Sequence, residues 1–164
     1  MSYRVGCGWD AHAFGEDGPL KLGGVEIPGA RGLSGHSDAD VLAHAVCDAI
    51  LGAAGLPDIG AHFPDDDPRY EGADSVGLLR MAAGYVAEKK YRAVNVDAVI
   101  IAQEPRLAPF FLRMRENIAA AVGLSPEDVS VKAASPEGLG AVGRGEGIAA
   151  QAVALLKKTS RSGS

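Results

Sequence analysis

The 164-residue chain has few aromatic residues, few cysteines and no excess of positive charge. Aromatic side chains make up 5% of it, too few for a platform on which nucleic-acid bases would stack. The formal net charge of −5 also argues against DNA or RNA as the main partner. Two cysteines cannot form a disulfide framework and fit a reducing compartment. Because no stretch has membrane-spanning length and the first residues have no apolar core, we expect a cytoplasmic protein.

Glycine is abundant instead, with 22 residues, about twice its usual share. Such a composition predicts many tight turns and close backbone approaches. The length is sufficient for one domain with its own hydrophobic core. We therefore expect residues 1–158 to form a single catalytic domain and residues 159–164 to form a disordered C-terminal tail.

Apolar periodicity and turn signals predict alternating strands and helices. The predicted strands lie at 3–8, at 20–27 as a hairpin turning on Gly23-Gly24, at 94–102 and at 129–133. The predicted helices lie at 38–54, 75–90, 109–122 and 148–158, with an ordered loop at 58–72. This order favours an α+β fold, in which one mixed β-sheet is packed by helices on one face.

The stretch 35–44 carries polar residues at the start of the first predicted helix. Ser37 is a suitable N-cap, and Asp40 three residues later would complete a capping-box-like pair. From there Asp40, His44 and Asp48 recur every four residues and would share one helix face. This histidine between two carboxylates fits either a platform for a metal ion or a surface histidine held by its neighbours. The opposite face is apolar and would pack on the core: Leu42, Val46, Ala49, Ile50 and Ala53.

A second carboxylate and imidazole pair, Asp10 and His12, follows the first predicted strand in a glycine-rich turn. Together with His44 they would supply the three ligands of a zinc site that keeps one position open for substrate. A structural turn is the alternative for Asp10 and a plain loop position for His12. Cys7 and Cys47 are possible rival ligands, although a free cysteine is more often a small buried hydrophobe.

Two further clusters are less specific. The run 65–67 of three aspartates could hold a divalent cation, but it lacks calcium-loop spacing and a solvated acidic loop fits it better, with His62 exposed beside it. Gly138, Gly140 and Gly143 spell Gly-x-Gly-x-x-Gly, yet no acidic residue follows at the distance that a dinucleotide site needs. The glycines still suit a loop whose backbone approaches phosphate.

The motifs taken together resemble the 2-C-methyl-D-erythritol 2,4-cyclodiphosphate synthase family of non-mevalonate isoprenoid biosynthesis. The matching stretches run in family order over nearly the whole chain: 8–14 (GWDAHAF), 35–40 (GHSDAD), 58–60 (DIG), 63–67 (FPDDD), 102–105 (AQEP) and 143–148 (GRGEGI). The resemblance implies a homotrimer with active sites between subunits. It implies one Zn²⁺ per subunit on Asp10, His12 and His44, and Mg²⁺ or Mn²⁺ on Glu137, bridging the substrate diphosphate.

The implied activity is that of a phosphorus–oxygen lyase acting on a small cytidine diphosphate. The 2-phosphate of 4-diphosphocytidyl-2-C-methyl-D-erythritol 2-phosphate attacks the β-phosphorus, CMP leaves, and 2-C-methyl-D-erythritol 2,4-cyclodiphosphate forms. A phosphate monoester is already anionic at neutral pH, so the reaction needs no general base. Its difficulty is to bring two anions together, which bound cations would neutralise and align.

The resemblance also implies site residues. His36 and Ser37 would lie against the phosphates, at a helix N-terminus that adds free backbone donors. Catalytic roles fall to His36, Ser135 and Glu137, and Asp10 and His12 count among the substrate contacts. The remaining substrate contacts form a methylerythritol pocket (Asp58, Ile59, Gly60, Phe63, Pro64, Asp65, Asp66, Asp67), a cytidine pocket (Ala102, Gln103, Glu104, Pro105, Arg106, Leu107, Ala108) and a phosphate loop (Ala134, Ser135, Pro136, Glu137, Ala141, Arg144).

This chain departs from the family pattern at three of these positions. Ala134 and Pro136 flank Ser135 where the family has a threonine-rich run, and Ala141 replaces a common aromatic residue. Two other functions also fit the residues. One is a zinc hydrolase that activates water, with Asp38 or Asp40 as its base. The other is a trimeric protein that binds a nucleotide or an isoprenoid diphosphate without turnover.

Overall fold

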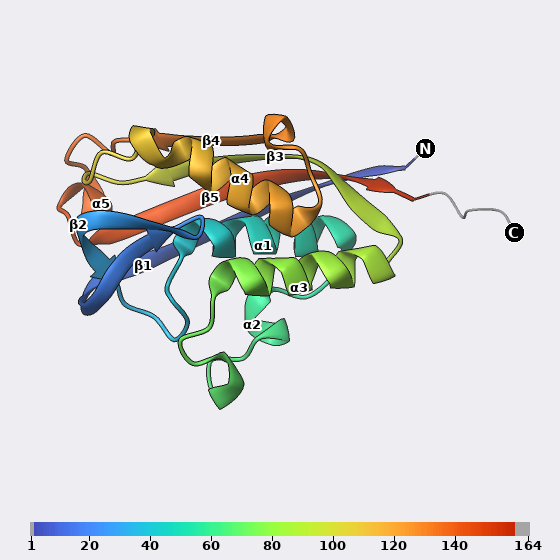
Figure 1. Cartoon of the computed structure of the whole chain (residues 1–164), viewed down its shortest axis with the longest axis horizontal. Coiled ribbons are helices and arrows are strands. Elements are labelled where there is room, and N and C mark those ends of the chain that lie inside the picture. Colours follow the sequence, from blue (N-terminus) through green and yellow to red (C-terminus); the bar gives the residue numbers. More distant parts are fainter. Residues whose placement is uncertain (1, 160–164) are drawn as a thin grey trace, which may run out of the picture.

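The computed structural model describes residues 2–159, which form one mixed β-sheet with helices gathered on one side of it (Figure 1). The sheet order is β2-β1-β5-β3-β4, and β3 and β4 are parallel while the other pairs are antiparallel. The strands are β1 (Tyr3–Leu22), β2 (Val25–Leu33), β3 (Tyr91–Ile101), β4 (Val129–Ala134) and β5 (Gly147–Lys158). The main helices are α1 (Val41–Ala54), α3 (Ser75–Glu88) and α4 (Phe111–Val122).

Short helical turns lie in the connections: α2 (Ile59–His62), α5 (Gly140–Gly143) and 3₁₀ turns at Pro68–Tyr70, Ala108–Phe110 and Pro126–Asp128. The predicted α+β class and mixed sheet are confirmed. So are the hairpin at Gly23-Gly24, the helices that end at Gly55 and Gly123 in left-handed C-caps, and the ordered character of the 58–72 loop. None of the described helices has both the length and the apolar character needed to cross a bilayer.

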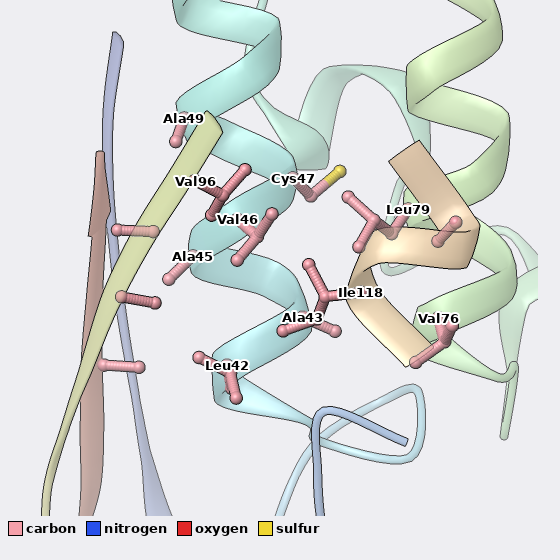
Figure 2. Close-up of a cluster of buried hydrophobic side chains, with 14 of the residues drawn as sticks. Leu42, Ala43, Ala45, Val46, Cys47, Ala49, Val76, Leu79, Val96 and Ile118 are labelled. Atoms are coloured by element: carbon pink, nitrogen blue, oxygen red, sulfur yellow. The ribbon is translucent and has the colours of Figure 1, made fainter. Parts of the chain in front are cut away.

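Helix α1 lies unusually close to the sheet because the facing residues are small. A Cβ atom on Gly8 would lie 1.9 Å from the carbonyl oxygen of Ala45, and one on Gly6 would lie 2.1 Å from that of Ala49. Figure 2 shows the side of α1 away from the glycines, where Cys47 points toward Leu79 of α3 and Val46 lies beside Val96 of β3. Helix α1 is therefore buried on nearly all sides, between the sheet and α3, and Ile118 of α4 belongs to the same core.

The first strand is much longer than predicted. Strand β1 runs from Tyr3 to Leu22, so Trp9, Asp10 and His12 lie within it and not in a turn after residue 8. Antiparallel pairing with β5 continues unbroken from Tyr3 to Ala13 and keeps this segment extended. Strand β2 likewise continues through Pro28 and Gly29 to Leu33, since it is an edge strand, where proline is tolerated.

The helix predicted at 148–158 is wrong, because this segment is strand β5 at the centre of the sheet. Its alanines and leucines have high helix propensity, and this local preference gave the wrong prediction. In the sheet, Ala150, Ala152, Ala154 and Leu156 are fully buried toward α1, while Gln151 and Val153 are exposed on the other face. This alternation is a strand pattern, but the small apolar residues on both faces obscure it in the sequence.

Two smaller predictions need comment. Helix α1 begins at Val41 with Asp40 as its N-cap, so the predicted Ser37 cap is wrong. Of the predicted tail at 159–164, residues 160–164 lie outside the described part of the chain. Thr159, which was assigned to that tail, donates through its backbone nitrogen to the carbonyl oxygen of Lys90 at 2.9 Å.

Candidate metal centre and substrate pocket

Three predicted ligands, Asp10, His12 and His44, converge between β1 and α1. Alternate residues of a strand face the same side, so Asp10 and His12 follow Gly6 and Gly8 on the face that meets α1. His44 is in the first turn of α1, directly before Ala45, whose carbonyl oxygen lies against Gly8. The Asp10 Oδ2 atom lies 3.0 Å from His12 Nε2 and 3.0 Å from His44 Nδ1.

The donor set fits a zinc ion. Nitrogen and oxygen ligands about 2.0–2.1 Å from zinc in a tetrahedron lie roughly 3.3 Å apart. The two 3.0 Å separations are close to this value, and the three donor atoms all lie within 4.8 Å of one another. One carboxylate and two imidazoles leave the fourth position for a substrate oxygen. Within the part of the chain that the structure describes, no other group of three such ligands is found.

Both histidines are held through the ring nitrogen that faces away from Asp10. The Nδ1 atom of His12 lies 2.8 Å from the backbone oxygen of Ser34. The Nε2 atom of His44 lies 2.8 Å from the Ser75 hydroxyl and 3.1 Å from the Ser37 hydroxyl. Such outer contacts orient metal-binding imidazoles, so the site has the second layer of support that a metal centre requires.

The electrostatics of the cluster keep Asp10 ionised. Burial opposes its charge, but hydrogen bonds with His12 and His44 outweigh that effect and lower the pKa of Asp10 to about 2. The hydrogen bond with Asp10 raises the pKa of His12 above its ordinary value, against the opposing effect of burial. The site therefore offers a deprotonated carboxylate at neutral pH, as a metal ligand must be.

The alternative roles considered for nearby residues are not supported. Cys47 is 1% exposed in the core, and burial raises the pKa of its thiol far above the usual range; Cys7 lies exposed in β1, outside the ligand cluster. Asp40 is fully buried and accepts hydrogen bonds from the backbone nitrogens of Gly23, Gly24 and Ala43. It ties the hairpin to α1, does not flank His44 as predicted, and has no access to solvent as a hydrolytic base.

Asp48, the other predicted neighbour of His44, instead accepts from the backbone nitrogen of Ile59 at 2.7 Å. This bond fixes α2 beside α1. The sequence predicted free backbone N–H groups at the start of this helix, but those of residues 38–40 already have acceptors. The nitrogens of Asp38, Ala39 and Asp40 donate to Ala73, Ser37 and Asp38 respectively.

A cavity of about 280 Å³ opens over the ligand cluster. It brings together nine of the predicted site residues: Asp10, His12, His36, Ser37, His44, Ile59, Gly60, Phe63 and Asp65. Gly35, Tyr70 and Leu78 complete its wall and were missed by the sequence analysis. The T-shaped contact of Tyr70 with Phe63, with ring centroids 5.3 Å apart, could not be inferred from spacing in an irregular loop.

Other predicted residues of this region support the cavity wall without lining it. Asp58 is the N-cap of α2, and Asp67 is the N-cap of the 3₁₀ turn at Pro68–Tyr70. Asp67 also forms an ion pair with Arg69, whose hydrogen bonds lower the pKa of that carboxyl. The prediction that His62 is exposed is wrong: its ring stacks on Tyr85 at 4.8 Å, and its Nε2 atom is buried without a hydrogen-bond partner among the described residues.

A second cavity, of about 840 Å³, contains predicted cytidine-pocket and phosphate-loop residues. Gln103, Glu104, Pro105, Arg106 and Arg144 line it, together with Phe14, Arg31 and backbone glycines. The two cavities share no lining residue. Ala102 and Leu107 are buried behind this loop.

Glu137 is exposed in the loop that follows β4. Its backbone has a left-handed conformation (φ 53°), which is uncommon for a non-glycine residue. The Glu137 nitrogen donates to the Ser135 hydroxyl at 3.0 Å, and the next nitrogen, of Gly138, donates to the Gln103 side chain at 3.0 Å. The second of these bonds joins the loop after β4 to the loop after β3, whereas Glu137 is not part of the Asp10 cluster.

Comparisons with known proteins agree with this geometry. The model of the YgbB family matches residues 3–157. A 2-C-methyl-D-erythritol 2,4-cyclodiphosphate synthase from Laribacter hongkongensis is 57% identical over 157 residues, which cover 96% of this chain and 97% of that protein. One from Moorella thermoacetica is 60% identical over 153 residues, with 93% and 94% covered.

Solved structures show the same fold. The bifunctional IspDF from Campylobacter jejuni superposes with a TM-score of 0.92 at 44% identity, over 96% of this chain and 42% of that longer protein. The CDP complex of IspF from Plasmodium falciparum gives a TM-score of 0.83 at 34% identity, over 96% and 97% of the two chains.

The fold and the histidine–carboxylate cluster thus define a small α+β enzyme with a candidate metal centre. The chain belongs to the YgbB family, that of the 2-C-methyl-D-erythritol 2,4-cyclodiphosphate synthases, which are lyases of non-mevalonate isoprenoid biosynthesis.

Proposed function

We propose that this chain converts 4-diphosphocytidyl-2-C-methyl-D-erythritol 2-phosphate to 2-C-methyl-D-erythritol 2,4-cyclodiphosphate and CMP. The observation that carries the proposal is the convergence of Asp10, His12 and His44 under a cavity whose rim holds His36 and Ser37. A CDP complex of a relative with the same fold supports a cytidine nucleotide as part of the substrate.

In the proposed reaction an oxygen of the 2-phosphate forms a bond to the β-phosphorus. The bond from that phosphorus to the bridging oxygen breaks, and CMP leaves with the electron pair. When bound, Zn²⁺ and a second ion, Mg²⁺ or Mn²⁺, supply the positive charge that this encounter of anions requires. No proton has to be removed from the nucleophile. The burial of Asp40, one of the two residues named as the base of a hydrolase, agrees with this.

The chain's own residues position the substrate. Asp10, His12 and His44 would hold the zinc ion, and Glu137 would hold the second ion together with substrate phosphates, as is usual for magnesium. His36 and Ser37 would contact the phosphates with their side chains. Ile59, Phe63 and Asp65 line the cavity that suits the methylerythritol unit. Gln103 to Arg106 would receive the cytidine, and Arg106 and Arg144 add positive charge beside it.

We further propose that the active form is a homotrimer. The face of the sheet opposite α1 exposes large apolar side chains: Tyr3, Val5, Trp9 and Val153 are 51%, 69%, 62% and 41% exposed. A contiguous apolar face on a sheet is typical of a subunit interface. Two separate cavities, one with the zinc ligands and one with the cytidine loop, suit a site that neighbouring subunits complete together. Sedimentation should give three times the chain mass of 16.8 kDa, and a monomer under active conditions would refute the trimer.

Incubation of the zinc-loaded protein with the cytidyl substrate and Mg²⁺ tests the reaction. Phosphorus NMR should show CMP and the cyclic diphosphate in equal amounts, without linear phosphates. Linear products would identify a hydrolase instead. Binding of CDP without any turnover would identify a binding protein.

A further inference from the structure

A chain of hydrogen bonds leads away from His44 on the side opposite Asp10. The Nδ1 atom of His44 lies 3.0 Å from Asp10 Oδ2, and its Nε2 atom lies 2.8 Å from the hydroxyl oxygen of Ser75. The Ser75 hydroxyl in turn hydrogen-bonds to Oδ1 of Asp38. Three elements meet here: α1, the first residue of α3, and the loop before α1.

The direction of these hydrogen bonds follows from the chemistry of Asp38. Its carboxylate already accepts from the backbone nitrogens of Ser75 at 3.2 Å and Asp40 at 3.3 Å, and Lys21 lies 4.0 Å away. An ionised carboxylate offers only acceptors, so the hydroxyl proton of Ser75 points to Asp38. The Ser75 oxygen then presents a lone pair to His44 Nε2 and favours the proton on that nitrogen. With that proton on Nε2, the lone pair of Nδ1 is available to an ion bound between Asp10 and His12, in place of the hydrogen bond that joins Nδ1 to Asp10 in the metal-free cluster.

The pair is shielded from solvent, and the Ser75 side chain does not cap α3. Ser75 is 1% exposed, and the Asp38 side chain is 10% exposed. The N-cap of α3 is Asp74, which accepts from the backbone nitrogen of Val76. Hydrogen bonds that are shielded from water are stronger than exposed ones, and a buried polar group that loses its partner costs more free energy.

We propose that Ser75, oriented by Asp38, is a positioning residue that holds His44 as an Nδ1 ligand for zinc. The inference rests on the zinc site of the proposed function and deepens it. The contact of His12 Nδ1 with the Ser34 carbonyl does the same for the second imidazole. A carbonyl oxygen can only accept, whereas a serine hydroxyl can rotate and either donate or accept. Asp38 fixes the direction of that hydroxyl.

Zinc affinity, measured by competition with a chromophoric chelator, tests the role without reference to turnover. Ser75→Ala and Asp38→Asn should each weaken zinc binding about 10- to 100-fold, the usual effect of losing an outer-layer partner. In Asp38→Asn, the new side-chain amide could turn its NH₂ group to Ser75 and release the hydroxyl proton toward Nε2. Asp38→Asn is nearly isosteric and carries the test if Ser75→Ala does not fold.

Ser37→Ala is the matched control. The Ser37 hydroxyl also lies 3.1 Å from His44 Nε2, yet its hydrogen bonds run to His44, Ser75 and the Ala39 nitrogen and not to the Asp38 carboxylate. This variant should weaken zinc binding much less than Ser75→Ala does, because Asp38 does not orient the Ser37 hydroxyl. An equal loss in Ser37→Ala would show that any hydroxyl near Nε2 suffices, and would overturn the role of Asp38.

Two readouts separate positioning from a general loss of stability. The double variant should bind zinc no more weakly than Ser75→Ala alone, because Asp38 acts through Ser75, whereas independent effects would add. In the zinc-loaded parent, nitrogen-edited NMR should show a slowly exchanging His44 Nε2 proton, which Ser75→Ala should lose. A parent that binds no zinc would overturn the metal site and this inference together. A parent that binds zinc, with Ser75→Ala binding it equally well, would overturn the positioning role alone.

Discussion

The substitution Gly8→Ala tests whether the close contact between β1 and α1 determines both stability and the metal site. The added Cβ atom would lie 1.9 Å from the Ala45 oxygen and 2.7 Å from the Ala49 nitrogen, whereas ordinary contacts begin at 3.4 Å. Both neighbours are backbone atoms, so no side chain can rotate away. The helix and strand must separate by roughly 1.5 Å, and α1 is packed on its far side by α3.

Overpacking a core usually costs about 1–3 kcal/mol, and the absence of a flexible neighbour places this case at the upper end, at about 3 kcal/mol. For a chain of this length each kcal/mol lowers Tm by about 2–4 °C, so thermal unfolding at a fixed protein concentration should shift down by roughly 6–12 °C. Zinc affinity should fall as well, because the movement separates His44 on α1 from Asp10 and His12 on β1.

The same substitution on the same helix provides the control. Gly52 is exposed on α1, and a Cβ atom there would meet nothing within 4 Å. Gly52→Ala should therefore raise the free energy of unfolding by up to about 1 kcal/mol through helix propensity. A Gly8→Ala variant that unfolds within 2 °C of the parent (about 1 kcal/mol or less) would refute the reasoning. So would a Gly52→Ala variant that is equally damaged.

Three further outcomes are expected. His44→Ala should fold but lose most of its zinc and its turnover, since its ring lies on the cavity side of α1; elemental analysis decides this, and undiminished zinc would exclude His44 as a ligand. Glu137→Gln should keep zinc and fold normally, yet turn over about a hundredfold more slowly at a given Mg²⁺ concentration; an unchanged Mg²⁺ dependence would reduce Glu137 to a loop carboxylate. In metal-free protein, Asp10 has a pKa of about 2 when folded against an ordinary value of 3.8, so its stabilisation of about 2 kcal/mol is present above pH 4 and lost as pH falls toward 2. Denaturant unfolding of the parent and Asp10→Asn, both metal-free, should therefore converge over that range, and a constant difference would contradict the assignment.

The three candidate metal ligands could be predicted from the sequence, but the residues that hold their side chains in place could not. Asp10, His12 and His44 are metal-binding residue types within recognisable motifs, and they converge as predicted. Ser75 is 31 residues from His44, and their contact depends on how α3 packs against α1. In the sequence Ser75 could be identified only as a residue at the start of a helix.

Strand β5 shows how local preference fails when tertiary pairing decides. Residues 147–158 consist largely of alanine, leucine and lysine, all good helix formers. They are extended because β1 and β3 pair with them on both sides over almost their whole length. The fully buried alanines toward α1 are required by the small helix–sheet distance, which cannot be read from residues 147–158 alone.

The glycine and alanine residues that distinguish the composition also build the site. Gly6 and Gly8 let α1 approach β1 closely. On the neighbouring strand β5, Ala150 and Ala152 have side chains small enough to allow the same close approach. Asp10 and His12 are the next residues after Gly8 on the same face of β1. The short distance between β1 and α1 at the glycines therefore also brings these two ligands close to His44. Asp40 fixes the N-terminus of α1 to the hairpin through Gly23 and Gly24, which leaves His44 little freedom along the helix axis. Backbone packing therefore sets the ligand spacing, and such preorganisation is what a site needs if it is to hold two phosphates against their mutual repulsion.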